Sequence, residues 1–420
     1  MTVTDRRQAL RSPRTQGSFA SDLADALATP GDDPRQRLVT FACPIDPVDP
    51  IALFGVAAAQ GLEAALWLQP SRGRSIAGVG RAWAFEGGGA DRFAAATSAW
   101  RAVLADAVGV EPLLLGGLGF TGEMPARDDV WASFGAASLV LPTFTVSHGE
   151  SVATLTVSIA PDRDEDPDPD DVERAWTELA AAAADPAASL TANGPLRIVD
   201  ERPDRAAWER TVGMFAGAVG RGRIDKVVLA RRVTFDAPTD LDVSAALRHL
   251  AATAPESTTF AFTRDGTTFL GATPERLART VGRSFETVAI AGSAPRGTDP
   301  ESDARYAAGL LASEKDHEEH AVVVETLRAD LAPIVETLTV AAAPGILALR
   351  HVQHLVTPMT GTLREEAGLL ALASLLHPTP AVGGEPRDTA LALIAEHEGF
   401  DRGWYSGPIG WLGADGDGEL

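Results

Sequence analysis

The chain has 420 residues, 45% of them hydrophobic, so it can bury a large core in one large domain or in two or three smaller ones. Its formal net charge of −22 argues against nucleic acid and anionic membranes as partners, and an anionic substrate would need positive charge supplied at its site. The single cysteine, Cys43, excludes an internal disulfide and a cysteine-based zinc site.

The N-terminal 18 residues predict a frayed tail, because they are basic and lack the apolar segment of a signal peptide. No run of 18 apolar residues is free of charge, so we expect no membrane span. Together with the lone cysteine, these features favour a cytoplasmic protein, and we expect a monomer.

Residues 19–200 alternate apolar strand patterns with helical ones. Residues 91–108 repeat apolar side chains at helical spacing, and a second helix is predicted from about Asp171. Strands, bounded by Pro, Gly and Ser, are predicted in the segments EAALWLQP, EPLLLGGLGF, ASLVLPTFTVS and ESVATLTVSIA.

After residue 200 the pattern changes, and polar residues enter apolar runs. A hairpin is predicted around the turn Asp265–Gly266, and one long helix over residues 301–333. Strands and helices mix without regular β-α-β alternation, which favours an α+β fold. Further strands are predicted in KVVLARR, ETVAIAGSAPRG, LALRHVQHLVTPMTGTL and GWYSGPIGWLG, and further helices in EEAGLLALASLLH and RDTALALIAEHE.

The charged segment SEKDHEEH opens the apolar part of the long predicted helix. Residues three and four apart share a helix face, so Asp316, Glu319 and His320 form one polar patch. Glu319 borders the apolar stripe, whereas Glu314 and Glu318 point towards solvent. A solvated face is the ordinary interpretation of such a run, but a carboxylate beside a buried stripe also suits Mg²⁺. The spacing leaves both interpretations open.

Three other residues allow both a structural and a chemical interpretation. Lys226 heads an apolar strand, where it either reaches water or loses its charge through burial and becomes a base. Glu275 follows a proline, as a solvated turn residue or as an acid. His354 is either a core histidine or part of a site. The segment AGSAPRG is a plain turn or a row of backbone N–H groups for a carboxylate.

Together and in order, seven motifs resemble the chorismate-utilising enzymes. The likeness is detailed from about residue 205 to residue 420 and loose before it. It implies an α+β fold with two β-rich halves wrapped by helices, divided into a variable half over 19–200 and a chorismate-binding catalytic region over 201–420. The motifs are KVVLARR, FLGATPERL, AIAGSAPRG, SEKDHEEH, HVQHLVTPMTG, LLHPTPAVGGEP and FDRGWYSGPIGWL.

Three positions resemble one branch of that family. Lys226 stands where the water-using isochorismate and salicylate synthases carry lysine. Ala291 stands where aminodeoxychorismate synthases carry a nucleophilic lysine, and Ala381 where salicylate and anthranilate synthases tend to carry threonine. The resemblance therefore implies an isochorismate synthase serving menaquinone or siderophore biosynthesis. The alternatives are a salicylate synthase, which also eliminates pyruvate, and a truncated, non-catalytic relative.

The resemblance also implies roles for individual residues. Lys226 would be the base that activates water, Glu275 the acid that protonates the leaving hydroxyl, and Glu319 a ligand of Mg²⁺. The substrate contacts that it implies are Gly292, Ser293, His354 and Ala381.

The family pattern continues for a few dozen residues past a GDGE turn, whereas this sequence ends at GADGDGEL. The resemblance therefore implies an incomplete C-terminal end. We expect a strand around Pro408 to Leu412 with unpaired backbone groups and exposed apolar side chains.

Overall fold

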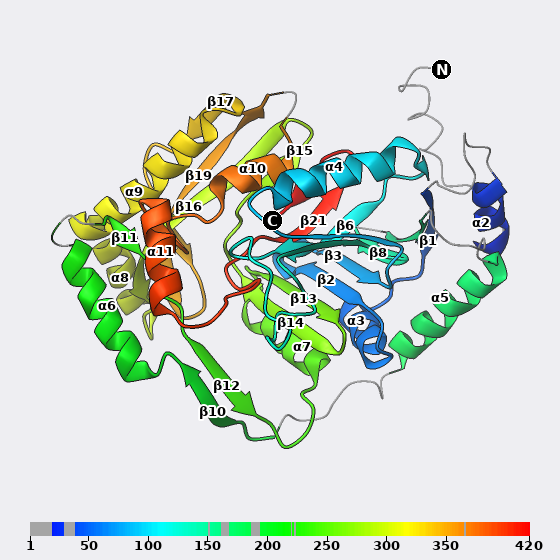
Figure 1. Cartoon of the computed structure of the whole chain (residues 1–420), viewed down its shortest axis with the longest axis horizontal. Helices are drawn as coiled ribbons and strands as arrows, with labels where there is room; N and C mark the ends of the chain where they lie inside the picture. The colour runs from blue at the N-terminus through cyan, green and yellow to red at the C-terminus, as the bar shows by residue number, and fades with distance from the viewer. Residues whose placement is uncertain are drawn as a thin grey trace.

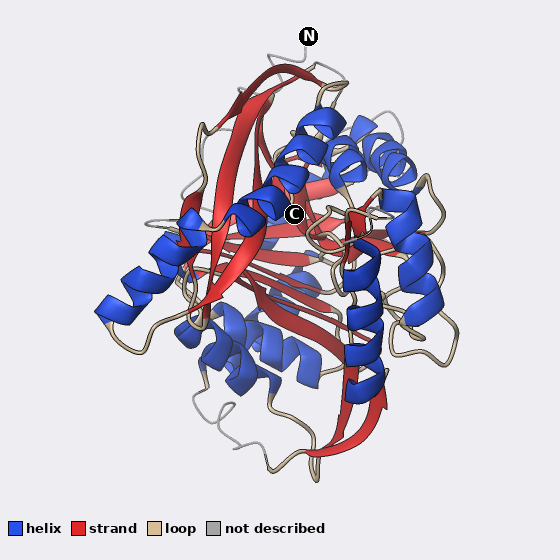
Figure 2. Ribbon diagram, turned by 90° about the vertical axis from the view of Figure 1, so that its left-hand side faces the viewer, coloured by secondary structure: helices blue, strands red, loops and turns tan. Residues whose placement is uncertain are grey.

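The computed structural model describes residues 19–28, 38–149, 152–160, 168–185, 194–219, 221, 224–364 and 367–420. The tail predicted over residues 1–18 lies outside them. Figures 1 and 2 show the strands of two large sheets in the interior, with helices on the outside. No helix of the described residues is long and apolar enough to cross a membrane.

The first sheet has eight strands in the order β14-β13-β2-β3-β8-β9-β1-β5, antiparallel except for β1 and β5. The predicted turn Asp265–Gly266 joins β13 to β14, and both residues have positive φ, as a type I′ hairpin turn requires. The strands are β1 (Val39–Ile45), β2 (Ala64–Gln69), β3 (Arg74–Val79), β5 (Val108–Gly109), β8 (Phe144–His148), β9 (Ala153–Ile159), β13 (Thr258–Arg264) and β14 (Thr267–Thr273).

Helices α2 (Phe19–Ala28), α3 (Pro50–Ala59), α5 (Pro169–Ala184) and α7 (Val243–Thr253) accompany this sheet. Helix α3 begins where Asp49 accepts hydrogen bonds from two backbone N–H groups, with proline at the first helical position. Phe54 and Leu66, both fully buried, belong to the core between α3 and the sheet. The short 3-10 turn η1 (Pro70–Arg72) links β2 to β3.

The second sheet has ten strands in the order β17-β19-β16-β15-β22-β21-β6-β7-β4, with β18 paired to β19. Its longest pairing is the antiparallel pair β16–β19, which lies near the β17 edge of the sheet. The strands are β4 (Trp83–Gly87), β6 (Leu113–Leu118), β7 (Ala137–Leu141), β15 (Arg279–Val281), β16 (Ser284–Pro295), β17 (Val335–Val340), β18 (Gly345–Ala348), β19 (Val352–Leu363), β21 (Ile409–Gly413) and β22 (Gly418–Glu419).

Each sheet takes strands from both halves of the chain. Strands β13 and β14 join the first sheet, and β4, β6 and β7 join the second. The expected mixed fold with two large β-sheets is confirmed, but neither sheet is built from one half of the sequence alone, because pairing between strands distant in sequence leaves no mark in the local pattern.

The helix predicted over residues 301–333 is in fact two helices, α8 (Pro300–Ala312) and α9 (Glu314–Leu331). Ser313 ends α8 and caps α9, with its hydroxyl accepting from the backbone N–H of Asp316 at 3.2 Å. Further helices are α4 (Arg92–Ala105), α6 (Arg205–Val219), α10 (Leu369–Leu376) and α11 (Arg387–His397).

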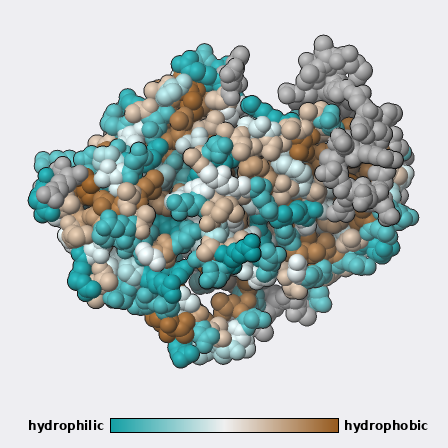
Figure 3. Space-filling model, in the orientation of Figure 1, coloured by the Kyte–Doolittle hydropathy of each residue, from teal (hydrophilic) through white to brown (hydrophobic). Residues whose placement is uncertain are grey.

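The strand predicted over KVVLARR is also shorter than expected. Strand β11 (Lys226–Val227) pairs with β20 (Gly384–Glu385) in a two-stranded sheet, and the chain then continues to β12 (Arg232–Asp236). Strand β12 pairs with β10 (Arg197–Arg202) in a separate two-stranded ribbon. Figure 3 shows apolar residues on this ribbon, where the side chains of Ile198 and Phe235 are about half exposed.

The C-terminal end does not have the exposed strand expected from the sequence. Strand β21 pairs with β6 on one side and with β22 on the other, and β22 pairs with β15. Ile409, Leu412 and Leu420 are buried. After β21 the chain turns back within a few residues, and β22 pairs with β21 as the neighbouring strand that the sequence did not predict.

Candidate active site

One side of the candidate site is formed by a β-bulge in the strand pair β16–β19. The register shifts between Ala291 and Ser293, and Gly292 takes a φ of +74° there. A Cβ at Gly292 would lie 3.2 Å from the Cβ of Asp316 and 3.4 Å from Leu355. Glycine is therefore required both by the backbone conformation and by the close approach of α9.

Ser293 and His354 face each other across the same strand pair. The Ser293 hydroxyl and the His354 Nδ1 are 2.8 Å apart. Burial lowers the pKa of His354, with a backbone contact at Gly292 acting in the opposite direction. The part of the cavity lined by Ser293 and His354 therefore offers polar groups, a hydroxyl and a neutral imidazole, without a fixed charge.

Lys226 enters the cavity from β11, which is held by its pairing with Gly384 and Glu385. Burial lowers the pKa of Lys226 from its ordinary 10.5, while the charges of Glu319 and Glu275 partly oppose that shift. Desolvation of the ammonium thus favours the neutral amine, which is the form that can accept a proton.

Glu275 lies after β14, where Thr273 and Pro274 turn the chain. The Thr273 hydroxyl accepts from the backbone N–H of Glu275 at 3.2 Å. Burial raises the pKa of Glu275 above its ordinary 4.5, and the charge of Lys226 partly opposes the rise. The environment therefore favours the protonated carboxyl, the form that can donate a proton.

The N-terminal end of α9 closes another side. Glu319 and Asp316 both line the cavity, and Lys315 Nζ lies 3.6 Å from Glu319 Oε1. His320 does not line the cavity with them, contrary to the patch expected from spacing: it is buried, with Nε2 2.7 Å from the Thr357 hydroxyl. It belongs to the stripe that packs α9 onto the second sheet.

Ala381 comes from the loop between α10 and β20. The loop begins at His377, which is buried and donates through Nε2 to the carbonyl oxygen of Phe120 at 3.0 Å. Burial lowers the pKa of His377 to about 3, so this histidine is neutral and anchors the loop rather than moving protons.

All seven residues singled out from the sequence line one cavity of about 450 Å³, within the size range of small-molecule sites. They are Lys226, Glu275, Gly292, Ser293, Glu319, His354 and Ala381. Sequence reasoning gave no site role to six further lining residues, although their motifs contain them. These are Thr273, Pro274, Ile290, Ala291, Lys315 and Asp316.

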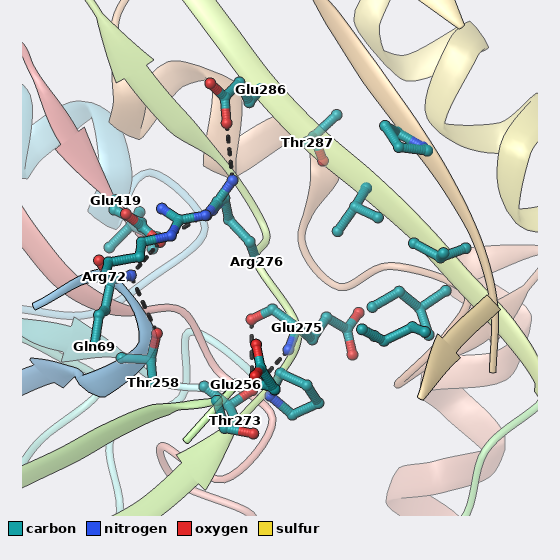
Figure 4. Close-up of a pocket in the computed structure, with 18 of the residues that line it drawn as sticks. Gln69, Arg72, Glu256, Thr258, Thr273, Glu275, Arg276, Glu286, Thr287 and Glu419 are labelled. Atoms are coloured by element: carbon teal, nitrogen blue, oxygen red, sulfur yellow. Dashed lines mark hydrogen bonds and ion pairs between the residues drawn. The ribbon is translucent and has the colours of Figure 1, made fainter. Parts of the chain in front are cut away.

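A second cavity, of about 260 Å³, shares Thr273, Pro274, Glu275 and Ile290 with the first. Figure 4 shows Arg276 reaching towards Glu286 and Glu419, and Glu275 pointing away from that cluster. These ion pairs hold Arg276, the residue after Glu275, and the Thr273 hydroxyl binds the backbone N–H of Glu275. The backbone is therefore held on both sides of Glu275.

Glu319 and Asp316 fit a magnesium ion better than a metal that needs a dense set of protein ligands. Among the described residues, no group of three or more His, Cys, Asp and Glu side chains is placed to hold a metal. Mg²⁺ usually takes one or two carboxylates and completes its shell with water and substrate oxygens. The partly exposed Glu319 carboxylate at a polar cavity supplies that kind of site.

The chain is similar to known proteins over nearly its whole length. A family model described as "Chorismate binding enzyme" matches residues 24–420. A salicylate biosynthesis isochorismate synthase of Pseudomonas aeruginosa is 37% identical, covering 96% of this chain and 84% of that protein. The isochorismate synthase MenF of Bacillus subtilis is 28% identical, covering 96% and 88%.

Two solved structures share the fold. The menaquinone-specific isochorismate synthase MenF of Escherichia coli has a TM-score of 0.76 at 24% identity, covering 96% of this chain and 88% of that one. Anthranilate synthase component I from Streptococcus pneumoniae has a TM-score of 0.58 at 21% identity, covering 73% and 70%.

The fold has two large sheets, with a cavity between β14, β16 and α9. The family model matches the chain over nearly its whole length. The chain belongs to the chorismate-binding enzymes. Within that family, its full-length relatives named above are isochorismate synthases.

Proposed function

We propose that this protein is a Mg²⁺-dependent isochorismate synthase, which converts chorismate to isochorismate. The main support is a lysine and a glutamate at one cavity, each with its pKa moved by burial towards the uncharged form. Environments that shift two groups in this way are typical of a base and an acid that work together.

The reaction adds water at ring C2, releases the C4 hydroxyl as water and shifts the ring double bonds, without a change of oxidation state. Lys226 as the neutral amine takes a proton from the attacking water, and Glu275 as the neutral acid gives one to the departing hydroxyl. Hydroxide leaves poorly, so the acid is chemically necessary. Each such transfer contributes typically ~10²–10⁴ in rate.

The substrate is a dianion, and the cavity offers groups that suit one of its carboxylates. The backbone of Gly292 and the hydroxyl of Ser293 would bind and orient it, with His354 fixing the serine. Glu319 would hold Mg²⁺, and the bound ion would supply the positive charge that neutralises the ring carboxylate. The −22 charge of the whole chain makes this local charge necessary.

Ala381 supports isochorismate as the final product, because lyase-active relatives tend to carry threonine at the matching position. The relatives are named for salicylate biosynthesis and for menaquinone. We therefore limit the proposed reaction to the step that these pathways share, the formation of isochorismate. We also propose that the protein is a cytoplasmic monomer. A salicylate synthase and a non-catalytic chorismate-binding protein are the alternatives.

Product analysis separates these three functions. The purified chain is incubated with chorismate and Mg²⁺, with a parallel sample in EDTA, and the products are resolved by liquid chromatography. We expect isochorismate that appears only with Mg²⁺. Salicylate with stoichiometric pyruvate would identify the lyase, and chorismate binding without turnover would identify the non-catalytic relative.

A further inference from the structure

Lysine is rare in this chain, and its positions are informative. Of the 36 Lys and Arg residues, only Lys226 and Lys315 are lysines. Both line the candidate active site, whose lining includes no arginine among the described residues. On a solvated surface either cation serves, and here the chain uses arginine. A lysine at each of these two positions indicates that the cavity requires an ammonium group there.

Lys315 is poorly placed to stabilise its own helix. It is the second residue of α9, where a positive charge opposes the helix dipole. It also precedes Glu319 by four residues, the less favourable order for an ion pair on a helix. Because helix stability does not explain a lysine here, its explanation lies in the cavity that it lines.

The pair between Lys315 and Glu319 is easily exchanged. The Nζ-to-Oε1 distance is 3.6 Å, and the lysine side chain is 81% exposed. Exposed pairs of this geometry are weak. Any cation that binds Glu319 more strongly therefore separates the pair and leaves the ammonium at the mouth of the cavity.

We propose that Lys315 captures the anionic substrate and that Glu319 controls its availability. Without a metal ion, Glu319 holds the ammonium. When a divalent cation takes Glu319, Lys315 is released and pairs with a carboxylate of the incoming dianion. Metal and substrate then bind cooperatively. This role rests on the proposed function, because it takes the same metal ligand and substrate class.

The chemistry of the two cations explains why arginine is avoided at this position. A guanidinium would bind the Glu319 carboxylate through two parallel hydrogen bonds, a stronger contact than a single ammonium makes. That pair would compete with the metal ion and resist release. An ammonium on a flexible stem competes weakly and can turn to the substrate.

Manganese binding without substrate tests the competition, with Mn²⁺ as the probe followed by electron paramagnetic resonance. Lys315→Met should bind Mn²⁺ about 2-fold more tightly than the unaltered chain, because the competing pair is gone. Lys315→Arg should bind it more weakly than the unaltered chain. Simple charge repulsion predicts instead that the arginine and lysine forms bind Mn²⁺ equally, and that result would overturn the competition.

Kinetics with chorismate test the capture. Lys315→Met should raise KM by about 10-fold with kcat within about 3-fold, as expected for the loss of a charge-assisted contact formed on binding. Arg328→Met is the matched control, since Arg328 forms an exposed pair with Glu325 on the same helix and does not line the cavity. It should change neither value.

The two assays fail separately. If the unaltered chain does not convert chorismate, the proposed function is wrong, while the Mn²⁺ titrations still report on the pair. If it does convert chorismate and Lys315→Met leaves KM unchanged, Lys315 does not capture the substrate and the inference is overturned.

Discussion

Lys226 and Glu275 carry the chemistry at the scale of single residues. Glutamine has the size of Glu275 but cannot donate an acidic proton, and at Lys226 it gives a shorter, uncharged side chain that cannot accept one. We expect Lys226→Gln and Glu275→Gln each to lower kcat by at least about 10², with little change in the circular dichroism spectrum. Steady-state kinetics measures the loss, and near-normal turnover would remove that residue from the mechanism.

Burial of Glu275 also has a consequence for stability. Its pKa is raised in the folded chain, so between 4.5 and the raised pKa the folded state binds more protons than the unfolded state. The free energy of unfolding contributed by this group is therefore lost as the pH rises through that window. Above it, an ionised carboxylate is buried at a cost.

Glu275→Gln removes this cost, so the variant should be more stable than the unaltered chain at neutral pH, and the difference should shrink as the pH falls towards 4.5. Thermal unfolding from pH 4.5 to pH 8 measures it. The same melting temperatures for both proteins at every pH would contradict the buried, protonated acid.

Glu319 and Glu318 are neighbours on α9 with different expected roles. Glu319 lines the cavity, whereas Glu318 does not. Glu319→Ala should abolish Mg²⁺-dependent turnover and weaken Mn²⁺ binding, and Glu318→Ala should be mild in both assays. Equal losses would mean that the segment acts only through its total charge.

At the scale of elements, the bulge of β16 positions the carboxylate-binding groups. Gly292→Ala forces alanine into a φ of +74°, at a cost of about 1–3 kcal/mol, and pushes its Cβ against Asp316 on α9. We expect lower stability together with a raised KM for chorismate, because the bulge and α9 line the same cavity.

Gly266→Ala is the matched control. Gly266 has a φ of +75°, but an added Cβ meets nothing within 4 Å, and the turn lies outside the cavity. It should lose comparable stability in denaturant unfolding and keep its KM. An unchanged KM in both variants would show that the bulge does not shape the site.

The elements also show how far local sequence patterns reach. The hairpin at Asp265–Gly266 was predictable because its turn chemistry is local. The break at Ser313 was missed, since the charged run that follows it continues the helical pattern, although serine before Glu and Asp is a capping signal. His320 was assigned to the polar patch because its neighbours are charged, but it is the first residue of the buried stripe that Val323, Leu327 and Leu331 continue at helical spacing.

More of the candidate site than of the strand order in the sheets could be predicted from the sequence. Residues such as Gly292 and Glu319 were named through motifs, and the structure gathers them at one cavity, while their roles stay predictions. Lys315 was visible in the same motif, but its significance needed the cavity. The pairing of β13 with β2 joins residues about 190 apart, and no periodicity encodes such contacts.

At the scale of the whole molecule, this exchange of strands predicts cooperative folding. The first sheet combines six strands from before residue 200 with β13 and β14 from after it. We expect one transition in differential scanning calorimetry of the full chain, and no stable fold for residues 201–420 alone, because β13 would lose its partner β2.

Two resolved transitions, or a folded fragment, would show instead that the division predicted near residue 200 separates two folding units. Circular dichroism and the dispersion of amide resonances in the fragment distinguish these outcomes.

The most direct test of the account is the origin of the new hydroxyl group. The chain is incubated with chorismate and Mg²⁺ in water enriched in ¹⁸O, and isochorismate formed early in the reaction is analysed by mass spectrometry. Water activated by Lys226 predicts one ¹⁸O atom in each isochorismate, and no product above background from Lys226→Gln. Unlabelled isochorismate would mean that the hydroxyl moves within the substrate, and it would contradict the central claim that this cavity adds water to chorismate.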